Sequence, residues 1–270
     1  MLKLSKRSII IVLVAVLIVW GVWGSFSLFY RFSGKSDSTT IEMAKGANLI
    51  IKTNLADIFI TGTNSNRLQA NSKKAGDIIT SKNGNDVIIE LKDRRFLAGG
   101  FLSLEVPMEL STITVNAEIG DIDIGSINTD DLVIETSTGD LTLTNIEASK
   151  IEARTHVGDI DVESTTAIDC INLFTNAGDV SLSNISAYAV KAETMAGDID
   201  LEGENIRQTD VKTSVGDIMI DTDLEKENST FNIKANDIYL FETHYSNPIS
   251  TGKGENLVNA ESSVGTIEIE

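Results

Sequence analysis

The chain has 270 residues, of which 41% are hydrophobic, and a formal net charge of −18. This length and hydrophobic content are sufficient for a sizeable core. The acidic excess argues against a nucleic-acid-binding protein, because phosphate contacts require Lys and Arg. A single cysteine, Cys170, excludes an intrachain disulfide and argues against a cysteine-based metal cluster.

The first 30 residues consist of a short basic tail, 1–8, and an uncharged apolar run, 9–30. A helix of that length spans the hydrocarbon core of a bilayer, and basic residues before it favour a cytoplasmic N-terminus. We therefore expect a single-pass anchor in the cell membrane, with the remainder extracytoplasmic. A cleaved signal peptide is the alternative. Residues 31–40 are polar and small, and predict a linker.

A Gly-Asp pair then recurs every 19 or 20 residues. Apolar residues alternate on both sides of each pair, which is typical of strands with one buried face. One such unit cannot bury its apolar face alone, whereas a stack of units can. The repeat predicts an all-β fold, a single-stranded β-solenoid over residues 119–270, with one coil per repeat. The repeated glycines are Gly120, Gly139, Gly158, Gly178, Gly197 and Gly216.

Each Gly-Asp pair predicts a structural corner between two strands. Glycine permits a positive φ angle, and the aspartate can accept hydrogen bonds from nearby N–H groups. A threonine three residues before most of these glycines predicts a ladder of stacked hydroxyl groups. Two weaker copies follow, at Asn236, a residue type that also tolerates a left-handed backbone, and at Gly265.

Residues 41–118 predict irregular first coils and a cap. "IKTNLADIFIT" (51–61) matches the repeat, and "KKAGDIIT" (73–80) is a second partial copy. Asn83-Gly84 between two β-rich runs predicts a hairpin. The ends of a solenoid must be covered, and we expect four apolar residues to cover the first coil: Phe96, Leu97, Phe101 and Leu102. The alternative is that these residues form a binding surface.

Stacking would bring the aspartates of the repeat into one row of candidate cation-binding residues: Asp121, Asp140, Asp159, Asp179, Asp198 and Asp217. Carboxylate oxygens suit Ca²⁺, but the paired glycines of the nine-residue calcium roll are missing. We expect weak cation binding at most, with no defined metal site and no cofactor.

Catalytic residues are not predicted. His156 and His244 have no obvious acid or base partner, and an acidic surface would repel an anionic glycan. The late aromatic residues Tyr239, Phe241 and Tyr245 are expected to form a packing cluster.

With its apolar anchor, short tether and Gly-Asp-aliphatic units, such as Gly158-Asp159 and Gly197-Asp198, the chain resembles a bacterial family. This is the "putative adhesin" β-solenoid family of domains of unknown function, which includes the LiaG- and YvlB-type proteins of envelope-stress operons. The resemblance covers about residues 40–270 and implies the solenoid fold. It carries over no catalytic or binding residues, and the adhesin label is an analogy from shape.

These features predict a non-catalytic, acidic interaction or sensing-accessory module of the bacterial cell envelope. Cationic peptides, or a basic patch on an envelope protein, would be attracted to it. One alternative is a self-associating structural element, in which Glu268 and Glu270 protect an open last edge. A calcium-dependent adhesin and a polysaccharide-cleaving solenoid enzyme are the others.

Overall fold

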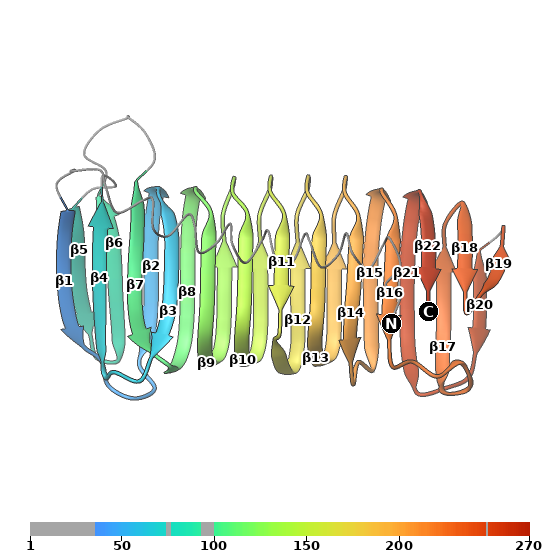
Figure 1. Cartoon of the computed structure of the whole chain (residues 1–270), viewed down its shortest axis with the longest axis horizontal. Helices are drawn as coiled ribbons and strands as arrows, with labels where there is room; N and C mark the ends of the chain where they lie inside the picture. Colours follow the sequence, from blue (N-terminus) through green and yellow to red (C-terminus); the bar gives the residue numbers. More distant parts are fainter. Residues whose placement is uncertain (1–35, 74–76, 93–99, 247) are drawn as a thin grey trace, which may run out of the picture. The chain divides into compact units, whose positions relative to one another are not determined.

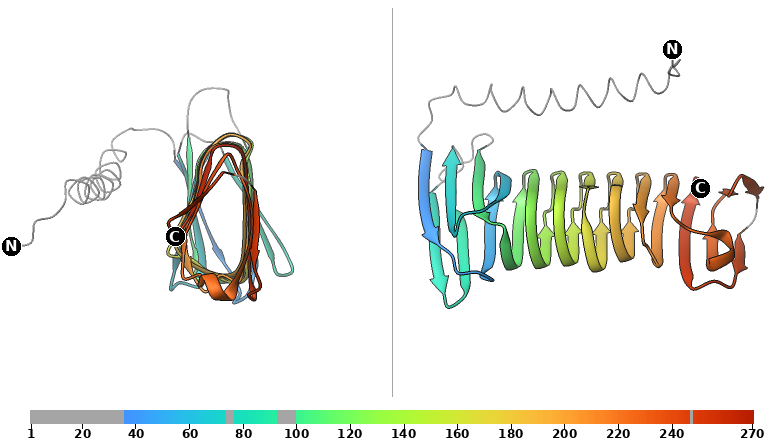
Figure 2. Two further views of the ribbon diagram at one scale, coloured as in Figure 1. Left: turned by 90° about the vertical axis from the view of Figure 1, so that its right-hand side faces the viewer. Right: turned by 60° about the horizontal axis from the view of Figure 1, so that its bottom comes forward.

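The alternating apolar residues of the repeat lie on strands whose inward side chains are buried. The computed structural model describes residues 36–73, 77–92, 100–246 and 248–270, and Ser36–Glu270 forms one unit. In this unit the chain winds into stacked coils with a sheet on each of two long faces (Figures 1 and 2). The predicted all-β solenoid is confirmed.

Parallel pairing of equivalent residues defines the regular coils. Leu141, for example, pairs with Ile122 on one side and with Ile160 on the other. Neighbouring coils therefore lie one strand spacing apart, about 4.8 Å. The strands are β8 (Glu109–Ile119), β9 (Ile122–Glu135), β10 (Leu141–Arg154), β11 (Ile160–Glu163), β12 (Thr166–Phe174), β13 (Val180–Glu193), β14 (Ile199–Glu204), β15 (Gln208–Val215) and β16 (Ile218–Thr222).

The two sheets meet along two edges. At the corner edge the chain turns through the Gly-Asp pairs. At the bend edge it turns through residues with φ angles of 51–60°: Ser126, Asn145, Ser164, Asn184 and Asn205. Strands β9, β10 and β13 continue through this bend, so a coil has two sides and no separate short third strand.

The predicted core positions are buried in every regular coil. In the coil that contains Gly158, the inward residues after the corner are Ile160 and Val162, and those before it are Ile151 and Ala153; all four are 0–1% exposed. Because each inward residue contacts its equivalents in the coils above and below, the core is continuous along the stack.

The N-terminal coils are not stacked in chain order. β2 and β3 form the first coil, but they lie between β8 and β9 on one side and β6 and β7 on the other. β4 and β1 continue the sheet beyond β7 with antiparallel pairing. The strands are β1 (Ser36–Glu42), β2 (Asn48–Leu55), β3 (Asp57–Thr63), β4 (Arg67–Lys73), β5 (Asp77–Asn83), β6 (Asp86–Lys92) and β7 (Phe101–Pro107).

Several sequence predictions for this end can be compared with the structure. The Asn83-Gly84 hairpin is confirmed, because β5 and β6 pair in antiparallel register around it. The interpretation of 73–80 as a partial copy of the repeat is wrong. Residues 77–80 lie in β5, which pairs in antiparallel register with β6 and has no buried residue, whereas a coil strand pairs in parallel and buries alternate side chains. The linker prediction is wrong for residues 36–40, which lie in β1.

The predicted cap is present in part. β7, which contains Phe101 and Leu102, covers β3 on the outer side, and Leu102 is fully buried. Phe96 and Leu97 lie outside the described residues.

The C-terminal coil is inserted into the stack. β21 and β22 lie between β15 and β16 on one side and β17 and β18 on the other. The elements are η2 (Lys226–Asn228), β17 (Ser229–Lys234), β18 (Asp237–Leu240), β19 (Thr243–Tyr245), β20 (Ile249–Gly252), β21 (Asn256–Val264) and β22 (Thr266–Ile269).

This insertion overturns the proposed role of Glu268 and Glu270 as guards of an open edge. β22 is paired on both sides, so it is not an edge strand. The edges at this end are the short antiparallel strands β19 and β20, and shortness is a common protection of exposed edges.

Within the described ranges, no helix has the length and apolar character needed to cross a bilayer. The segments assigned to a cytoplasmic tail, 1–8, and to a membrane anchor, 9–30, lie outside those ranges.

Candidate interaction surfaces

The repeated glycines are corner residues for two separate reasons. Gly120 to Gly216 have φ angles of +141 to +152°, and Gly265 has +156°, a region that side chains disfavour. A Cβ atom at Gly158 would also lie 2.2 Å from the carbonyl oxygen of Gly139 in the preceding coil. Asn236, in contrast, has no positive φ, so its predicted left-handed backbone is wrong.

The aspartates after these glycines form a hydrogen-bonded row, here called the aspartate row. Oδ1 of each aspartate before Asp217 accepts the backbone N–H of the aspartate in the next coil. The backbone N–H of Asp159 donates to Oδ1 of Asp140 at 2.9 Å, and the backbone N–H of Asp179 donates to Oδ1 of Asp159 at 2.8 Å. The row begins at Asp57 and includes Asp121, Asp140, Asp159, Asp179, Asp198 and Asp217.

The threonines before the corner do not form the predicted hydroxyl ladder. Four of the five hydroxyls instead donate to the glycine carbonyl of the preceding coil, as Thr175 does to Gly158 at 3.0 Å, and the hydroxyl of Thr136 donates to the Thr138 carbonyl. The same bond joins Thr155 to Gly139 and Thr213 to Gly197. These threonine side chains are buried, so the hydroxyl groups satisfy carbonyl groups that would otherwise lack a partner.

The aspartate row borders the acidic face, which is the outer surface of the sheet from β9 through β10, β11, β13, β14 and β16 to β22. The segments of this face contain no Lys or Arg; they are 121–125, 140–144, 159–163, 179–183, 198–202, 217–221 and 266–270, and the structure describes all of them. In the described part of the chain, no residue of the aspartate row from Asp121 to Asp217 forms an ion pair. Acidic side chains are thus uncompensated along seven coils.

A second, shorter row of aspartates lies on this face, two residues after the aspartate row, and its pKa values are shifted. The pKa values of Asp123, Asp161 and Asp200 are raised, mainly because neighbouring side chains remove water from the carboxylates. For Asp161, the negative charges of Asp159, Asp140 and Asp179 raise the pKa further. For Asp200, the negative charges of Asp198 and Asp179 likewise add to the effect of lost hydration.

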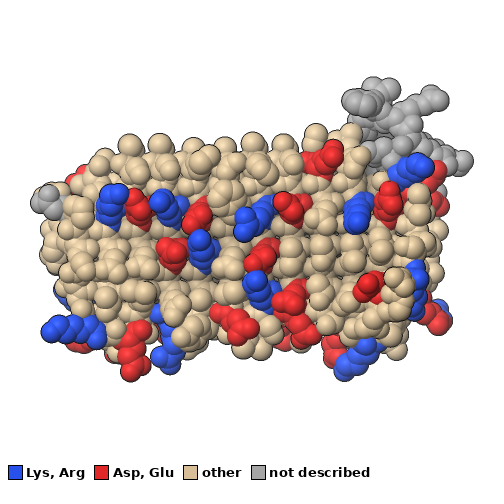
Figure 3. Space-filling view, turned by 180° about the vertical axis from the view of Figure 1, so that it is seen from behind, with Lys and Arg blue, Asp and Glu red and all other residues tan. Residues whose placement is uncertain are grey.

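The opposite sheet carries a mixed-charge face, formed by β6, β2, β8, the second halves of β9, β10 and β13, and by β12, β15, β21 and β17. Figure 3 shows its basic and acidic side chains alternating along the stack. In spatial order, one row is Glu90, Lys52, Asn116, Glu135, Arg154, Phe174, Glu193, Lys212, Glu261 and Lys234. Acidic and basic residues alternate in this row and are equal in number, four of each, so the row itself has no net charge.

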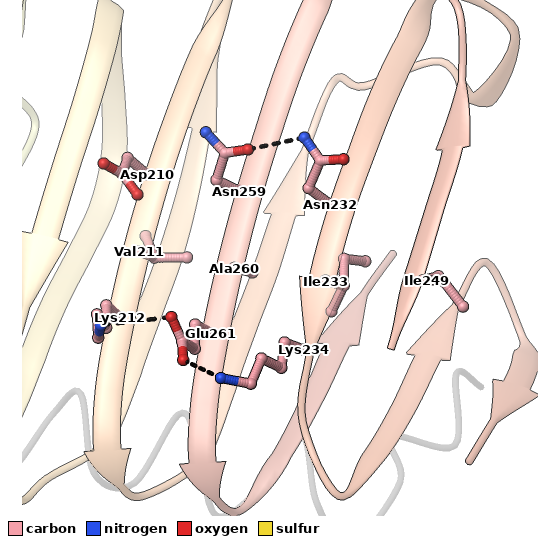
Figure 4. A pocket seen from close by; sticks show the side chains of 10 residues that line it. All are labelled: Asp210, Val211, Lys212, Asn232, Ile233, Lys234, Ile249, Asn259, Ala260 and Glu261. Carbon is pink, nitrogen blue, oxygen red and sulfur yellow. Dashed lines mark hydrogen bonds and ion pairs between the residues drawn. The ribbon is translucent and has the colours of Figure 1, made fainter. Parts of the chain in front are cut away.

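A groove of about 240 Å³ lies at the C-terminal end of the mixed-charge face (Figure 4). Glu261 bonds to Lys212 at 3.3 Å and to Lys234 at 2.6 Å. Beside them the Asn232 amide donates to Asn259 at 3.0 Å. The polar groups drawn in Figure 4 are largely engaged with one another, so the groove offers few free groups to a ligand.

The late aromatic residues divide between core and surface. Phe241 packs edge-on against the buried Phe231, with ring centroids 5.7 Å apart. Tyr239 is 40% exposed and stacks on His244, and Nε2 of His244 lies 3.1 Å from Oδ1 of Asp237. The predicted packing cluster is therefore confirmed for Phe241 and Tyr245, which pack against the core, and is wrong for Tyr239.

The remaining candidate residues are dispersed. Cys170 is partly exposed, and its sulfur accepts a 3.5 Å contact from Asn172. His156 is exposed at the corner edge, far along the chain from His244. In the ranges that the structure describes, no group of three or more His, Cys, Asp or Glu side chains is arranged to hold a metal ion.

A family model described as Toastrack DUF4097 matches residues 48–270. The chain belongs to this family. The Toastrack match begins at the first residue of β2 and extends to the last residue of the chain, so it covers both acidic and mixed-charge faces. The resemblance to "putative adhesin" domains of unknown function is thereby confirmed.

Two solved structures show the same fold. A "putative adhesin" from Bacteroides fragilis is 19% identical, with a TM-score of 0.56, and one from Parabacteroides distasonis is 12% identical, with a TM-score of 0.55. Each alignment covers 88% of this chain and 98% of the other. No curated protein matches the Toastrack chain.

Proposed function

We propose that this Toastrack protein is a membrane-anchored, adhesin-like interaction module of the bacterial cell envelope, which recruits cationic partners through its acidic face and does not catalyse a reaction. The observation that carries the proposal is the uncompensated acidic face. Seven successive coils expose carboxylates there without a basic residue, whereas basic residues alternate with acidic ones along a row of the opposite face.

Negative charge concentrated on one face attracts a cationic partner before the two molecules touch. Carboxylates fixed on stacked strands sum into an extended negative potential, which raises the local concentration and association rate of cations. The partners that fit are basic peptides or a Lys/Arg patch of an envelope protein. Two of the solved neighbours bear the name "putative adhesin", which agrees with a binding role.

The location follows from the sequence before β1. Residues 9–30 are uncharged and apolar, and the first 37 residues hold five of the 22 basic residues but one of the 40 acidic residues. We infer a single-pass anchor with a cytoplasmic N-terminus. The solenoid then lies outside the cell membrane, where anionic lipid headgroups repel its acidic face.

Titration of the full chain in non-ionic detergent with oligo-lysine tests the proposal. We expect an affinity that falls steeply as ionic strength rises, because screening weakens exposed charge interactions. The variant Asp159→Asn/Asp179→Asn/Asp198→Asn should bind more weakly. Asn retains the side-chain oxygen that accepts the N–H of the next coil, so the fold should be preserved.

The matched control removes three charges from the other face, as Glu90→Gln/Glu135→Gln/Asp210→Asn. Both triple variants change the net charge equally, so a general charge effect would weaken both by the same factor. Equal weakening, or an affinity indifferent to salt, contradicts the role of the acidic face. Turnover of a cell-wall polymer by the protein would contradict a non-catalytic role.

A further inference from the structure

An exposed apolar ridge runs along the corner edge, one residue before each glycine. Ile119, Val157, Val215 and Val264 are 49–56% exposed. Each is in parallel register with its equivalent in the next coil. We call this row the apolar ridge: Ile119, Thr138, Val157, Ala177, Ala196, Val215 and Val264.

The ridge runs parallel to the aspartate row. Val157 and Asp159 are separated by Gly158 alone, so their Cα atoms are at most about 7 Å apart. Both side chains are exposed, and an aspartate follows the ridge residue by two positions in every coil from Ile119 to Val215, whereas Thr266 replaces it after Val264. Figure 3 shows the corner edge along its upper margin, where uncharged side chains line the regular coils. The edge therefore presents one apolar and one anionic row, side by side.

We propose that this double row is the docking site of a cationic amphipathic helix from a partner protein or peptide, an inference that rests on the proposed function and locates its binding site. Such a helix has a stripe of apolar residues with Lys or Arg beside it. Its apolar stripe would cover the ridge while its cations bind the aspartate row.

The dimensions agree with a helix. Seven ridge residues at a spacing of about 4.8 Å span about 29 Å, which equals about 19 helical residues at 1.5 Å each. A helix presents one apolar side chain per turn at about 5.4 Å, close to the coil spacing. An extended peptide repeats its outward side chains at about 6.6 Å, so it loses register within a few coils.

Charge complementarity selects this occupant over two others. A second copy that docked ridge to ridge would bring two uncompensated aspartate rows together, and like charges destabilise such a contact. An anionic lipid surface would meet the same repulsion. A cationic helix buries the exposed valines and compensates the carboxylates simultaneously.

The test compares two peptides on the full chain in non-ionic detergent: a 19-residue amphipathic Lys/Leu helix and a shorter oligo-lysine with the same number of lysines. The wild-type chain should bind the Lys/Leu helix about tenfold more tightly, because apolar area is removed from water. In Val157→Thr/Val215→Thr this preference should disappear, with oligo-lysine affinity unchanged. Threonine is compatible with this position, because Thr138 occupies it.

The matched control is Ile168→Thr/Tyr188→Thr. These side chains are 71% and 50% exposed, and they lie near the bend edge rather than the corner edge. The control should retain the preference. Thermal unfolding monitored by circular dichroism should show that both variants are folded.

Two results separate this inference from the proposed function. If both peptides bind equally, or if the ridge variant keeps the preference, the docking site is wrong while acidic recruitment stands. If neither peptide binds, both are wrong. Ridge-dependent dimers in sedimentation would assign the ridge to a second copy. Ridge-dependent binding of detergent-free protein to phosphatidylcholine vesicles would assign it to lipid. Either result would overturn the helix assignment.

Discussion

The backbone N–H of Thr266 donates to Oδ1 of Asp217 at 2.7 Å, although 49 residues separate them in the chain. This bond continues the aspartate row into the C-terminal coil, where Thr266 takes the place of an aspartate. The corner is therefore maintained by contacts between coils, and each copy depends on its spatial neighbour.

Replacement of a corner glycine should destabilise the stack. Gly158→Ala would place a Cβ atom 2.2 Å from the Gly139 carbonyl oxygen at a φ of +143°. We expect the free energy of unfolding to fall by at least about 2 kcal/mol. Gly84→Ala is the control, since Gly84 has a φ of +62° with no atom near its Cβ position, and should cost about 1 kcal/mol. Equal losses in urea unfolding would contradict the steric explanation.

The aspartate row should tolerate Asn but not Ala. Asp159 accepts the Asp179 N–H at 2.8 Å, and Asn retains an oxygen for this bond while removing a negative charge. Asp159→Ala should lower the free energy of unfolding by about 1 kcal/mol, whereas Asp159→Asn should be neutral or stabilising. Thermal unfolding at low salt distinguishes them. A severe loss with Asn would show that the charge itself is required.

Asp161 should make stability depend on pH. Its pKa is raised in the folded protein by lost hydration and by Asp159, Asp140 and Asp179. Its stabilising contribution is therefore complete below the unfolded pKa, about 3.9, and is lost as the pH rises through the folded value. Asp161→Asn should raise the unfolding temperature at pH 7 and have little effect at pH 3.

Glu152 provides a control of opposite sign. Its pKa is lowered, mainly by the hydrogen bond from Lys150, so its contribution is present above the unfolded pKa and is lost as the pH falls. Glu152→Gln should lower the unfolding temperature slightly at pH 7. The same shift at both pH values for Asp161→Asn would contradict its raised pKa.

Deletion of residues 256–270 should disrupt the C-terminal end selectively. It removes β21 and β22, including the buried Val258 and Ile267, and leaves Lys212 and Lys234 without Glu261. Amide hydrogen exchange should accelerate in β17 and β18 and remain slow in β9 to β12, because coils contact only their neighbours. Unchanged protection of β17 would contradict the inserted position of this coil.

The local pattern of the repeat was sufficient to predict the coil. Alternating apolar residues identified the buried positions, such as Ile160 and Val162, since a strand exposes successive side chains on opposite faces. The glycine period identified the corners, including the copy with Ala56 in the glycine position. The apolar ridge could also have been predicted from the glycine period, because its residues all occupy the position directly before a corner glycine.

The pairing partners could not be predicted from the period. Thr175 donates to Gly158 rather than to another threonine, because the two residues become neighbours only when the coils stack. The row of alternating charges on the mixed-charge face also could not be predicted, because its order is set by which coils stack next to each other. Chain order would place Lys212 next to Lys234, but the inserted Glu261 separates them.

The sequence by itself determined the all-β class, the coil length, the inward residues and the glycine corners. All of these follow from steric rules and periodicities within about 20 residues. The tertiary structure alone decided the order of the terminal coils, the closed position of β22 and the alternation of charge along one row of the mixed-charge face. These three features depend on which strand edges are left unpaired after the regular coils have stacked. The backbone N–H and C=O groups of any strand can pair with those of any other. Burial and opposite charges between residues distant in the chain therefore select the arrangement.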